Sequence, residues 1–158
     1  EFDIICHSLG AEVTTNLLFN DEVKSSIATP KQTMINVFFI GPAISKRHFK
    51  NYLARGSEAQ PAEEQDNYRL HILFNHEDIV LSKSGRILGI RIEFSRLYGN
   101  TRLGCNCKKD AFELQKRFEK KFPNSMLKLY SAESIGRSHR FKSYVKSPEF
   151  ADMMRSLQ

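Results

Sequence analysis

Short, nearly continuous apolar runs alternate along the chain with longer amphipathic stretches. The apolar runs favour strands covered on both faces of a parallel sheet, because their hydrophobicity hardly alternates. The amphipathic stretches repeat apolar residues every three or four positions, which indicates helices. The predicted strands are Phe2–Cys6, Met34–Ile40, Tyr68–Phe74 and Met126–Ser131, and the predicted helices are Gly10–Asn20, Ser45–Arg55, Asp110–Phe122 and Ser147–Leu157.

Two predicted helices carry more detailed signals. In the first, Val13, Leu17 and Leu18 form the expected apolar stripe. In the third, Asp110 and Glu113 have the spacing of a capping box, which satisfies backbone N–H groups at a helix start. The buried stripe of the third helix is expected to comprise Ala111, Leu114, Phe118 and Phe122.

The remaining stretches are more polar or carry mixed signals. Residues 79–98 are ambiguous: Ile79–Leu81 suits a helix start, whereas apolar residues alternate from Leu88 to Phe94 as in a strand. The sequence predicts loops at residues 21–32, 56–67, 100–107 and 134–143.

Strands that alternate with helices predict a single α/β domain over residues 1–158, built on a mainly parallel sheet with flanking helices. Ligands of such sheets bind at the carboxyl ends of the strands. Ser8, Asp78 and His139 follow the first, third and fourth predicted strands. We therefore expect these three side chains to share one edge of the sheet.

These three residue types suit nucleophilic catalysis. A serine hydroxyl needs a base to take its proton, a carboxylate to orient that base, and amides to hold the oxyanion. The segment Cys6–Gly10 reads small-x-Ser-x-Gly between a predicted strand and helix, as in a nucleophile elbow. We expect Ser8 to attack, Asp78 to orient His139, and the Leu9 backbone N–H to bind the oxyanion. Cys6 stands where glycine is usual.

Other acids and histidines fit these roles less well. Glu77 is a neighbouring alternative to Asp78, while Asp66 and Asp110 are predicted in a loop and at a helix start. His139 alone among the histidines follows the last predicted strand. The other histidines have different expected places: His71 packed within a strand, His48 on a helix, His76 just before the acid, and His7 beside the serine, shaping the pocket.

The stretch DIICHSLGAEVTTNLL, Asp3 to Leu18, resembles the elbow of the serine esterase and lipase branch of the α/β-hydrolases. More specifically, it is similar to a bacterial α/β-hydrolase family of unknown physiological role. That family's acid phrase N-x-x-D-x-x-L matches Asn75–Leu81, and its phrases L-S-R-L and R-L-G resemble Phe94–Leu97 and Arg102–Gly104. Its histidine phrase, G-H-S-Y-F…S-P-E-V, is similar to Ser138–Phe150. The resemblance implies that His139 is the base.

The same resemblance implies a serine hydrolase that cleaves a small-molecule or lipid carboxylic ester through an acyl-enzyme, with no cofactor. The departures are Cys6 for glycine and an insertion at Ser82–Ile92. Such hydrolases place several strands before the elbow, and a loop there supplies the second oxyanion amide. We therefore expect this chain to be the C-terminal part of a longer hydrolase. Losing one oxyanion donor lowers the rate by ~10²–10³, so this length alone is expected to be weakly active or inactive.

The charge distribution supports a competing hypothesis, a catalytically silent scaffold or anion-binding module. The net charge is +6, and residues 67–158 hold 18 basic and 9 acidic side chains. A basic half suits an anionic partner such as a lipid headgroup. A nucleic acid is not expected, because aromatic residues are not interleaved with the basic ones.

Three cysteines give no disulfide framework, which favours a reducing compartment, by default the cytoplasm. Cys105 and Cys107 lack the second ligand pair of a structural zinc site, so no metal is expected. A thiol hydrolase using Cys6 is a distant alternative, since a thiol within a strand is usually inert. The sequence contains no apolar run of the ~20 residues that a membrane-spanning helix needs.

Overall fold

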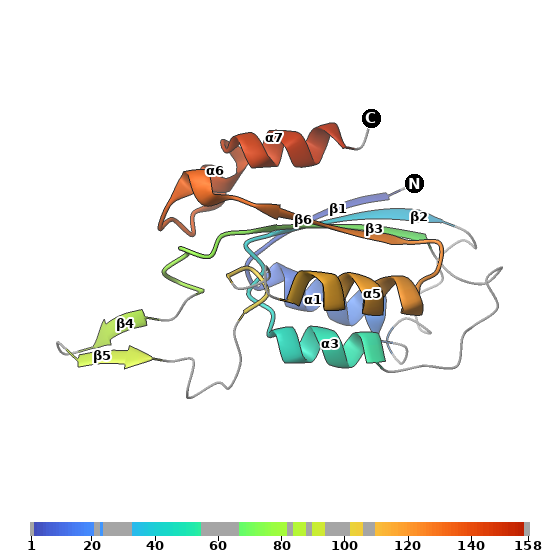
Figure 1. Ribbon diagram of the computed structural model, residues 1–158, viewed down its shortest axis with the longest axis horizontal. Coiled ribbons are helices and arrows are strands. Elements are labelled where there is room, and N and C mark those ends of the chain that lie inside the picture. Colours follow the sequence, from blue (N-terminus) through green and yellow to red (C-terminus); the bar gives the residue numbers. More distant parts are fainter. Residues whose placement is uncertain are drawn as a thin grey trace.

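Figure 1 shows the computed structural model of the chain. It describes residues 2–20, 23, 33–54, 67–81, 84–87, 90–93, 102–105 and 110–156.

A four-stranded parallel sheet forms the centre of the described structure. Its strands lie in the order β1-β2-β3-β6. They are β1 (Phe2–His7), β2 (Met34–Ile40), β3 (Asn67–Phe74) and β6 (Met126–Ser131). The prediction of an α/β fold with a parallel sheet is confirmed. Because all four strands run the same way, their carboxyl ends lie along one edge.

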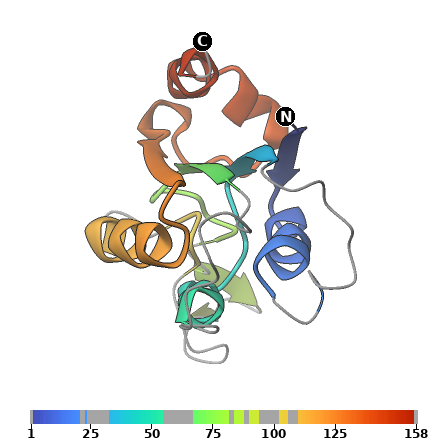
Figure 2. The same ribbon diagram turned by 90° about the vertical axis from the view of Figure 1, so that its right-hand side faces the viewer.

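Helices cover both faces of this sheet (Figures 1 and 2). One face carries α1 (Gly10–Phe19), α3 (Lys46–Ala54) and α5 (Ala111–Lys121). The other carries α6 (Phe141–Val145) and α7 (Pro148–Arg155). Ser147 caps α7 as its Pro148 signal predicts, since the serine hydroxyl oxygen accepts a hydrogen bond from the Phe150 N–H at 3.1 Å.

Each face of the sheet carries an apolar core. The larger core lies beneath α1, α3 and α5 and includes interlocking aromatic rings: Phe19, Phe49, Tyr68, Phe118 and Phe122. The smaller core lies beneath α6 and α7 and contains Phe38, Ile40, Leu73, Ala132, Tyr144 and Met153. Residues 35–40 of β2 are all buried, as expected for a strand covered on both faces.

The predicted apolar stripe of α1 is wrong. Val13 and Leu17 are 61% and 42% exposed, and only Leu18 of the three packs against the core. The buried residues of α1 are Ala11, Thr14, Thr15 and Phe19. Small residues at this contact let the helix lie close to the sheet. The threonine hydroxyls are satisfied locally: Thr15 donates to the Ala11 carbonyl at 2.7 Å, and Thr14 pairs with the Cys6 thiol at 2.9 Å.

The capping box of α5 does not form. Asp110 occupies the N-cap position, but its side chain makes no capping hydrogen bond. Instead Asp110 binds Lys46 and Lys50 of α3, and Glu113 also binds Lys50. The two lysines of α3 thus take the carboxylates that a capping box would use. The resulting ion pairs join α3 to α5. Of the predicted α5 stripe, Leu114, Phe118 and Phe122 are buried, while Ala111 is half-buried.

One predicted loop and the ambiguous stretch contain regular structure. The stretch 134–143 overlaps a short 3-10 helix, η3 (Glu133–Ile135), and the start of α6. In the ambiguous stretch, residues 79–81 form a turn, and β4 (Ser84–Ile87) pairs with β5 (Ile90–Glu93) in an antiparallel hairpin. Leu88 and Phe94 lie outside the described residues.

None of the helices in the described ranges is long and apolar enough to cross a membrane.

Candidate active site

Ser8 occupies a strained turn between β1 and α1. Its φ is +55°, a left-handed value that side-chain-bearing residues rarely adopt, at a cost of ~1–2 kcal/mol. Backbone hydrogen bonds hold this conformation: the Ser8 N–H donates to the Ile40 carbonyl at 3.2 Å, and the Ser8 carbonyl accepts from Ala43 at 2.9 Å. These bonds tie the backbone of the turn to the end of β2 and to the residues that follow it.

The cysteine at the first small position of the elbow leaves room beside Gly10 at the second. A Cβ added at Gly10 would lie 3.7 Å from the Cys6 Cβ, an ordinary van der Waals contact. Burial raises the pKa of the Cys6 thiol, partly offset by its hydrogen bond with Thr14. Cys6 is therefore a packed, protonated side chain at neutral pH.

The structure brings the three predicted site residues together. Ser8 Oγ lies 3.0 Å from His139 Nε2, and His139 Nδ1 lies 2.6 Å from Asp78 Oδ2. The residues joined by these hydrogen bonds are 131 and 61 positions apart in the sequence. The predicted juxtaposition at the carboxyl ends of the strands is confirmed, and we call these residues the triad.

Asp78 is fully buried, and both of its carboxylate oxygens are occupied. Oδ1 accepts hydrogen bonds from the backbone N–H groups of Val80 at 3.0 Å and Leu81 at 3.1 Å. Oδ2 accepts from His139 and, at 2.8 Å, from the hydroxyl of Tyr144. Four donors around one carboxyl suit an ionised carboxylate, which can only accept. Asp78 is thus fixed in position and directs its charge at the histidine.

Tyr144 is a site residue that sequence reasoning missed. It is fully buried, and burial together with the charge of Asp78 raises its pKa, so the phenol keeps its proton and donates. Gly41, just after β2, has φ +49°, and a Cβ there would lie 2.8 Å from the Tyr144 hydroxyl oxygen. Glycine at this position therefore makes room for the tyrosine. Tyr144 follows His139 by five residues, but its contact with Asp78 has no local sequence signal.

Asn75 joins the loop of the acid to the loop of the base. Its buried side-chain amide donates to the Gly136 carbonyl at 2.5 Å, and its oxygen accepts from the Glu77 N–H at 3.0 Å. The Asn75 carbonyl also accepts from the Asp78 N–H at 3.1 Å. This asparagine, the first residue of the N-x-x-D phrase, therefore fixes the spacing between Asp78 and His139.

His7 contacts the base more closely than expected. Its ring centre lies 4.9 Å from that of His139, and its Nε2 lies 3.1 Å from the His139 carbonyl oxygen. Burial and the proximity of His139 lower the pKa of His7, which favours the neutral ring with a proton on Nε2. His7 therefore does more than shape the pocket: it supports the backbone of the base.

The other candidate residues lie away from the triad. His71 is buried in β3, as predicted, while His48 on α3 pairs with Glu12 at 3.3 Å and exposed His76 approaches Glu133 at 3.7 Å. The alternative acids do not reach His139: Glu77 is exposed, Asp110 pairs with α3 lysines, and Asp66 lies outside the described residues.

The backbone N–H of Leu9, the predicted oxyanion donor, lies at the start of α1. Leu9 directly precedes the first turn of α1, where the helix dipole favours negative charge. Among the described residues, no acceptor takes a hydrogen bond from the Leu9 N–H. The predicted donor is therefore unoccupied and adjacent to Ser8.

The described residues contain no group of three side chains able to hold a metal ion. Buried Cys105 has its Sγ 3.4 Å from the His76 carbonyl, and burial together with the charge of Asp78 raises its pKa to about 11. Cys107 lies outside the described residues. No protein-family model, curated protein or solved structure matches this chain.

Proposed function

We propose that this protein is a serine hydrolase of the α/β-hydrolase type that cleaves carboxylic esters. The observation that carries the proposal is the hydrogen-bonded series Ser8–His139–Asp78, with its serine on a left-handed turn after a parallel strand. The parallel sheet and the unoccupied Leu9 amide support the same proposal.

The geometry supports an acyl-enzyme route. Ser8 Oγ attacks the ester carbonyl while His139 Nε2 takes the hydroxyl proton, and the carbonyl oxygen gains negative charge beside the Leu9 N–H. Asp78 stabilises the positive charge that His139 acquires. The C–O bond of the ester then breaks, and His139 returns the proton to the leaving alcohol. Water attacks the acyl-Ser8 ester with His139 again as base, which releases the carboxylic acid and restores Ser8.

A catalytically silent scaffold is the second candidate, favoured by the basic half of the chain. It explains the site less well. A scaffold has no need of a positive φ at Ser8, which costs ~1–2 kcal/mol, nor of a buried carboxylate aligned with a histidine. Strain of this kind gathers at functional sites because the mechanism uses it.

Hydrolysis of a short, soluble nitrophenyl ester separates the two candidates. We expect Ser8→Ala and His139→Gln each to lower kcat by at least ~10³-fold, since removing either residue disables the same unit. Cys6→Ala is the matched control, because the Cys6 thiol is buried and bonded to Thr14. It should retain most activity.

If Ser8→Ala hydrolyses the ester as fast as the wild type, the proposal fails. If instead Cys6→Ala alone removes activity, the thiol alternative is correct.

A further inference from the structure

Four apolar side chains around the triad are exposed to solvent. Leu9 is 65% exposed, Val80 56%, Phe141 45% and Ile79 43%. Scattered apolar residues on a surface are ordinary, but a contiguous group marks an interaction site. These four come from the three loops that carry the triad.

Contacts place these loops beside one another. Leu9 follows Ser8, which is hydrogen-bonded to His139, and the Val80 N–H is bonded to Asp78. The ring centre of Phe141 lies 5.5 Å from that of His7, whose own ring lies 4.9 Å from His139. The exposed apolar residues therefore surround the approach to the serine.

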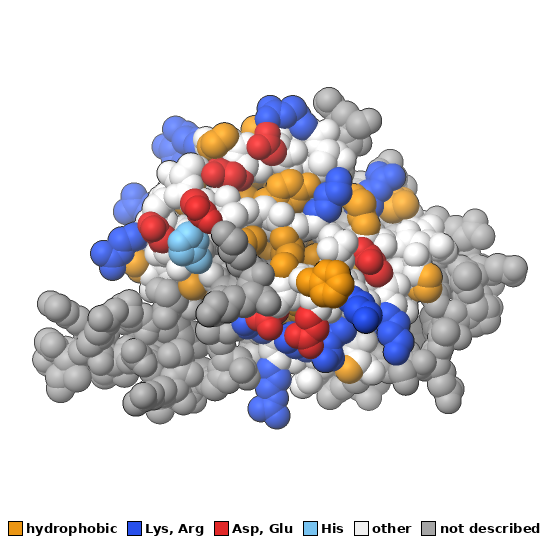
Figure 3. Space-filling model, in the orientation of Figure 1, with side chains coloured by type: hydrophobic (Ala, Val, Ile, Leu, Met, Phe, Trp, Pro, Cys, Tyr) orange, Lys and Arg blue, Asp and Glu red, His pale blue; other side chains and the backbone are white. Residues whose placement is uncertain are grey.

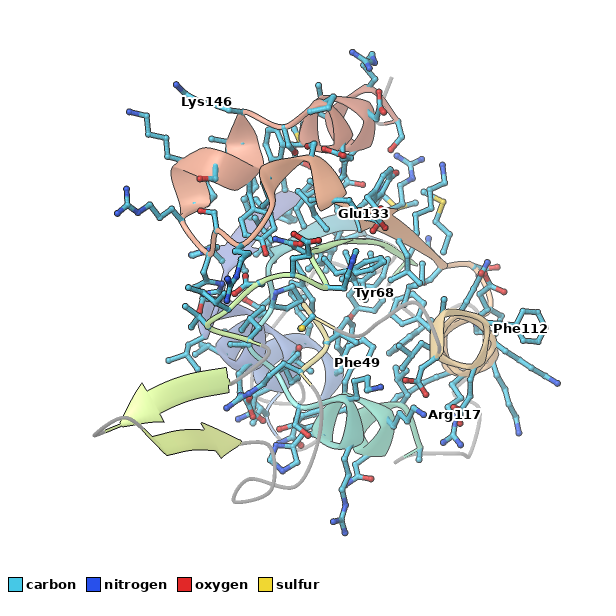
Figure 4. All side chains as sticks on the ribbon, turned by 60° about the vertical axis from the view of Figure 1, so that its left-hand side comes forward. Phe49, Tyr68, Phe112, Arg117, Glu133 and Lys146 are labelled. Carbon is cyan, nitrogen blue, oxygen red and sulfur yellow. The ribbon has the colours of Figure 1, made fainter. Side chains whose placement is uncertain are left out.

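The loop of the base adds a group of cations to this apolar rim. Residues 137–146 contain Arg137, Arg140, Lys142 and Lys146 and no acidic residue. All four cations are exposed, and none forms an ion pair with another described residue. Basic side chains line the margin of the molecule at α6 (Figure 3), and Lys146 projects outward there (Figure 4).

Of the acidic residues near this margin, Glu77 is exposed, with its Oε2 4.0 Å from the position of a Cβ on Gly136, whereas Glu133 and Glu149 have other partners. Exposed Glu133 is approached by His76 at 3.7 Å, and the carboxylate of Glu149 accepts a hydrogen bond from the Ser134 hydroxyl at 2.7 Å. The base loop therefore presents four exposed cations beside the single carboxylate of Glu77 and keeps a net positive charge that can attract an external anion.

We infer that the rim of the triad, Leu9, Ile79, Val80 and Phe141 with Arg137, Arg140, Lys142 and Lys146, docks onto the surface of an anionic phospholipid bilayer. Cations attract the anionic headgroups, while neighbouring apolar side chains enter the boundary between headgroups and acyl chains. Docking needs no catalysis. That the bilayer then presents its ester to Ser8 rests on the proposed function.

A bilayer fits this rim better than a nucleic acid does. Single-stranded nucleic acids bind where aromatic rings stack on the bases between cations. Here three of the four exposed apolar side chains are aliphatic, namely Leu9, Ile79 and Val80. Aliphatic side chains gain little against a polar phosphate backbone, but they gain from burial among lipid chains.

Co-sedimentation with vesicles tests the docking. The full chain carrying Ser8→Ala, which leaves the lipid intact, is mixed with phosphatidylcholine vesicles that contain either no phosphatidylserine or about a third of it. We expect binding only to the anionic vesicles. The triple variant Arg137→Gln/Lys142→Gln/Lys146→Gln should lower the partition coefficient by ~100-fold, since each cation contributes about fivefold. Ile79→Ser should lower it by about fivefold through lost apolar burial.

The matched control is Arg47→Gln/Lys116→Gln/Lys120→Gln, which removes the same charge from exposed positions on α3 and α5. It should change binding by less than about fivefold. Equal binding to both vesicles, or equal losses in the two triple variants, would overturn the inference. Tighter binding to single-stranded RNA, unaffected by Ile79→Ser, would replace the bilayer by a nucleic acid.

Hydrolysis of the soluble ester by the wild-type chain separates this inference from the proposed function. Hydrolysis without vesicle binding overturns the docking alone. Vesicle binding with neither hydrolysis nor a fluorophosphonate adduct on Ser8 overturns the proposed function alone.

Discussion

At the scale of single residues, one carboxylate oxygen organises the candidate site. Asp78 Oδ2 accepts hydrogen bonds from His139 Nδ1 and from the Tyr144 hydroxyl. The order of Ser8, Asp78 and His139 could be predicted because each follows an apolar strand of a parallel sheet. Tyr144 could not, because neither a motif nor a strand end marks it as a partner of the acid that it contacts.

The variant Tyr144→Phe tests how the site depends on the Asp78 oxygen that accepts from both His139 and Tyr144. The variant keeps the buried ring but removes the donor, which should lower the free energy of unfolding by about 1.5–3 kcal/mol, because the acceptor is charged. Without the tyrosine donor, the negative charge of Asp78 stabilises the protonated form of His139 more strongly. We expect the acidic limb of the pH profile of kcat/KM to move to higher pH, and kcat/KM to fall by about tenfold as the base loses its alignment.

Denaturant unfolding and the pH–rate profile measure the two effects. A purely structural tyrosine would change the stability and leave the acidic limb of the profile where it is in the wild type.

At the scale of elements, the strands were easier to predict than the faces of the helices. β2 is an apolar run interrupted by Asn36, and its burial on both faces follows from that run. In α1 the apolar residues Val13 and Leu17 point to solvent, whereas Thr14 and Thr15 are buried. A polarity pattern counts threonine as polar and misses its small size and local hydrogen bonds. The five-residue helix α6 is too short to show a period.

The turn after β2 gives a prediction at this scale. Gly41 has φ +49°, and any Cβ there would meet the Tyr144 hydroxyl at 2.8 Å. Gly41→Ala should lower the free energy of unfolding by about 2 kcal/mol or more, because it combines left-handed strain with a steric clash. It should also lower esterase activity by moving Tyr144 away from Asp78.

Gly10→Ala is the matched control, since a Cβ at Gly10 meets only an ordinary contact. Equal stability losses in the two variants would contradict this account of Gly41.

At the scale of the whole molecule, the smaller core contains an ionisable side chain. His71 is fully buried between Phe38 and Tyr130, and its Nε2 has no hydrogen-bond partner among the described residues. Burial, aided by the charges of Lys128 and Arg69, lowers its pKa from 6.5 to about 4. The native state therefore holds a neutral histidine, as predicted for a packed core position.

Because the pKa of His71 is lower in the native chain than in the unfolded chain, the free energy of unfolding depends on pH. The unfolded chain binds a proton at His71 as the pH falls below about 6.5, whereas the native chain does so only near 4. Protonation therefore favours unfolding, and about 3 kcal/mol of stability is lost between these values. His71→Phe should flatten the pH dependence of the free energy of unfolding in this window.

Val13→Ala, at an exposed position on α1 and with no ionisable group, is the control and should leave that dependence unchanged. A wild-type stability that is constant from pH 6.5 to 4 would rule out a buried neutral histidine.

The central claim is that Ser8 is an activated nucleophile, and covalent labelling tests it most directly. The chain is incubated with a fluorophosphonate, and the modified residue is located by mass spectrometry of the digested protein. We predict one adduct, on the peptide that contains Ser8, absent from Ser8→Ala and strongly reduced in His139→Gln. A wild-type chain that takes up no label, or a Ser8→Ala chain that labels as strongly as the wild type, would contradict the claim.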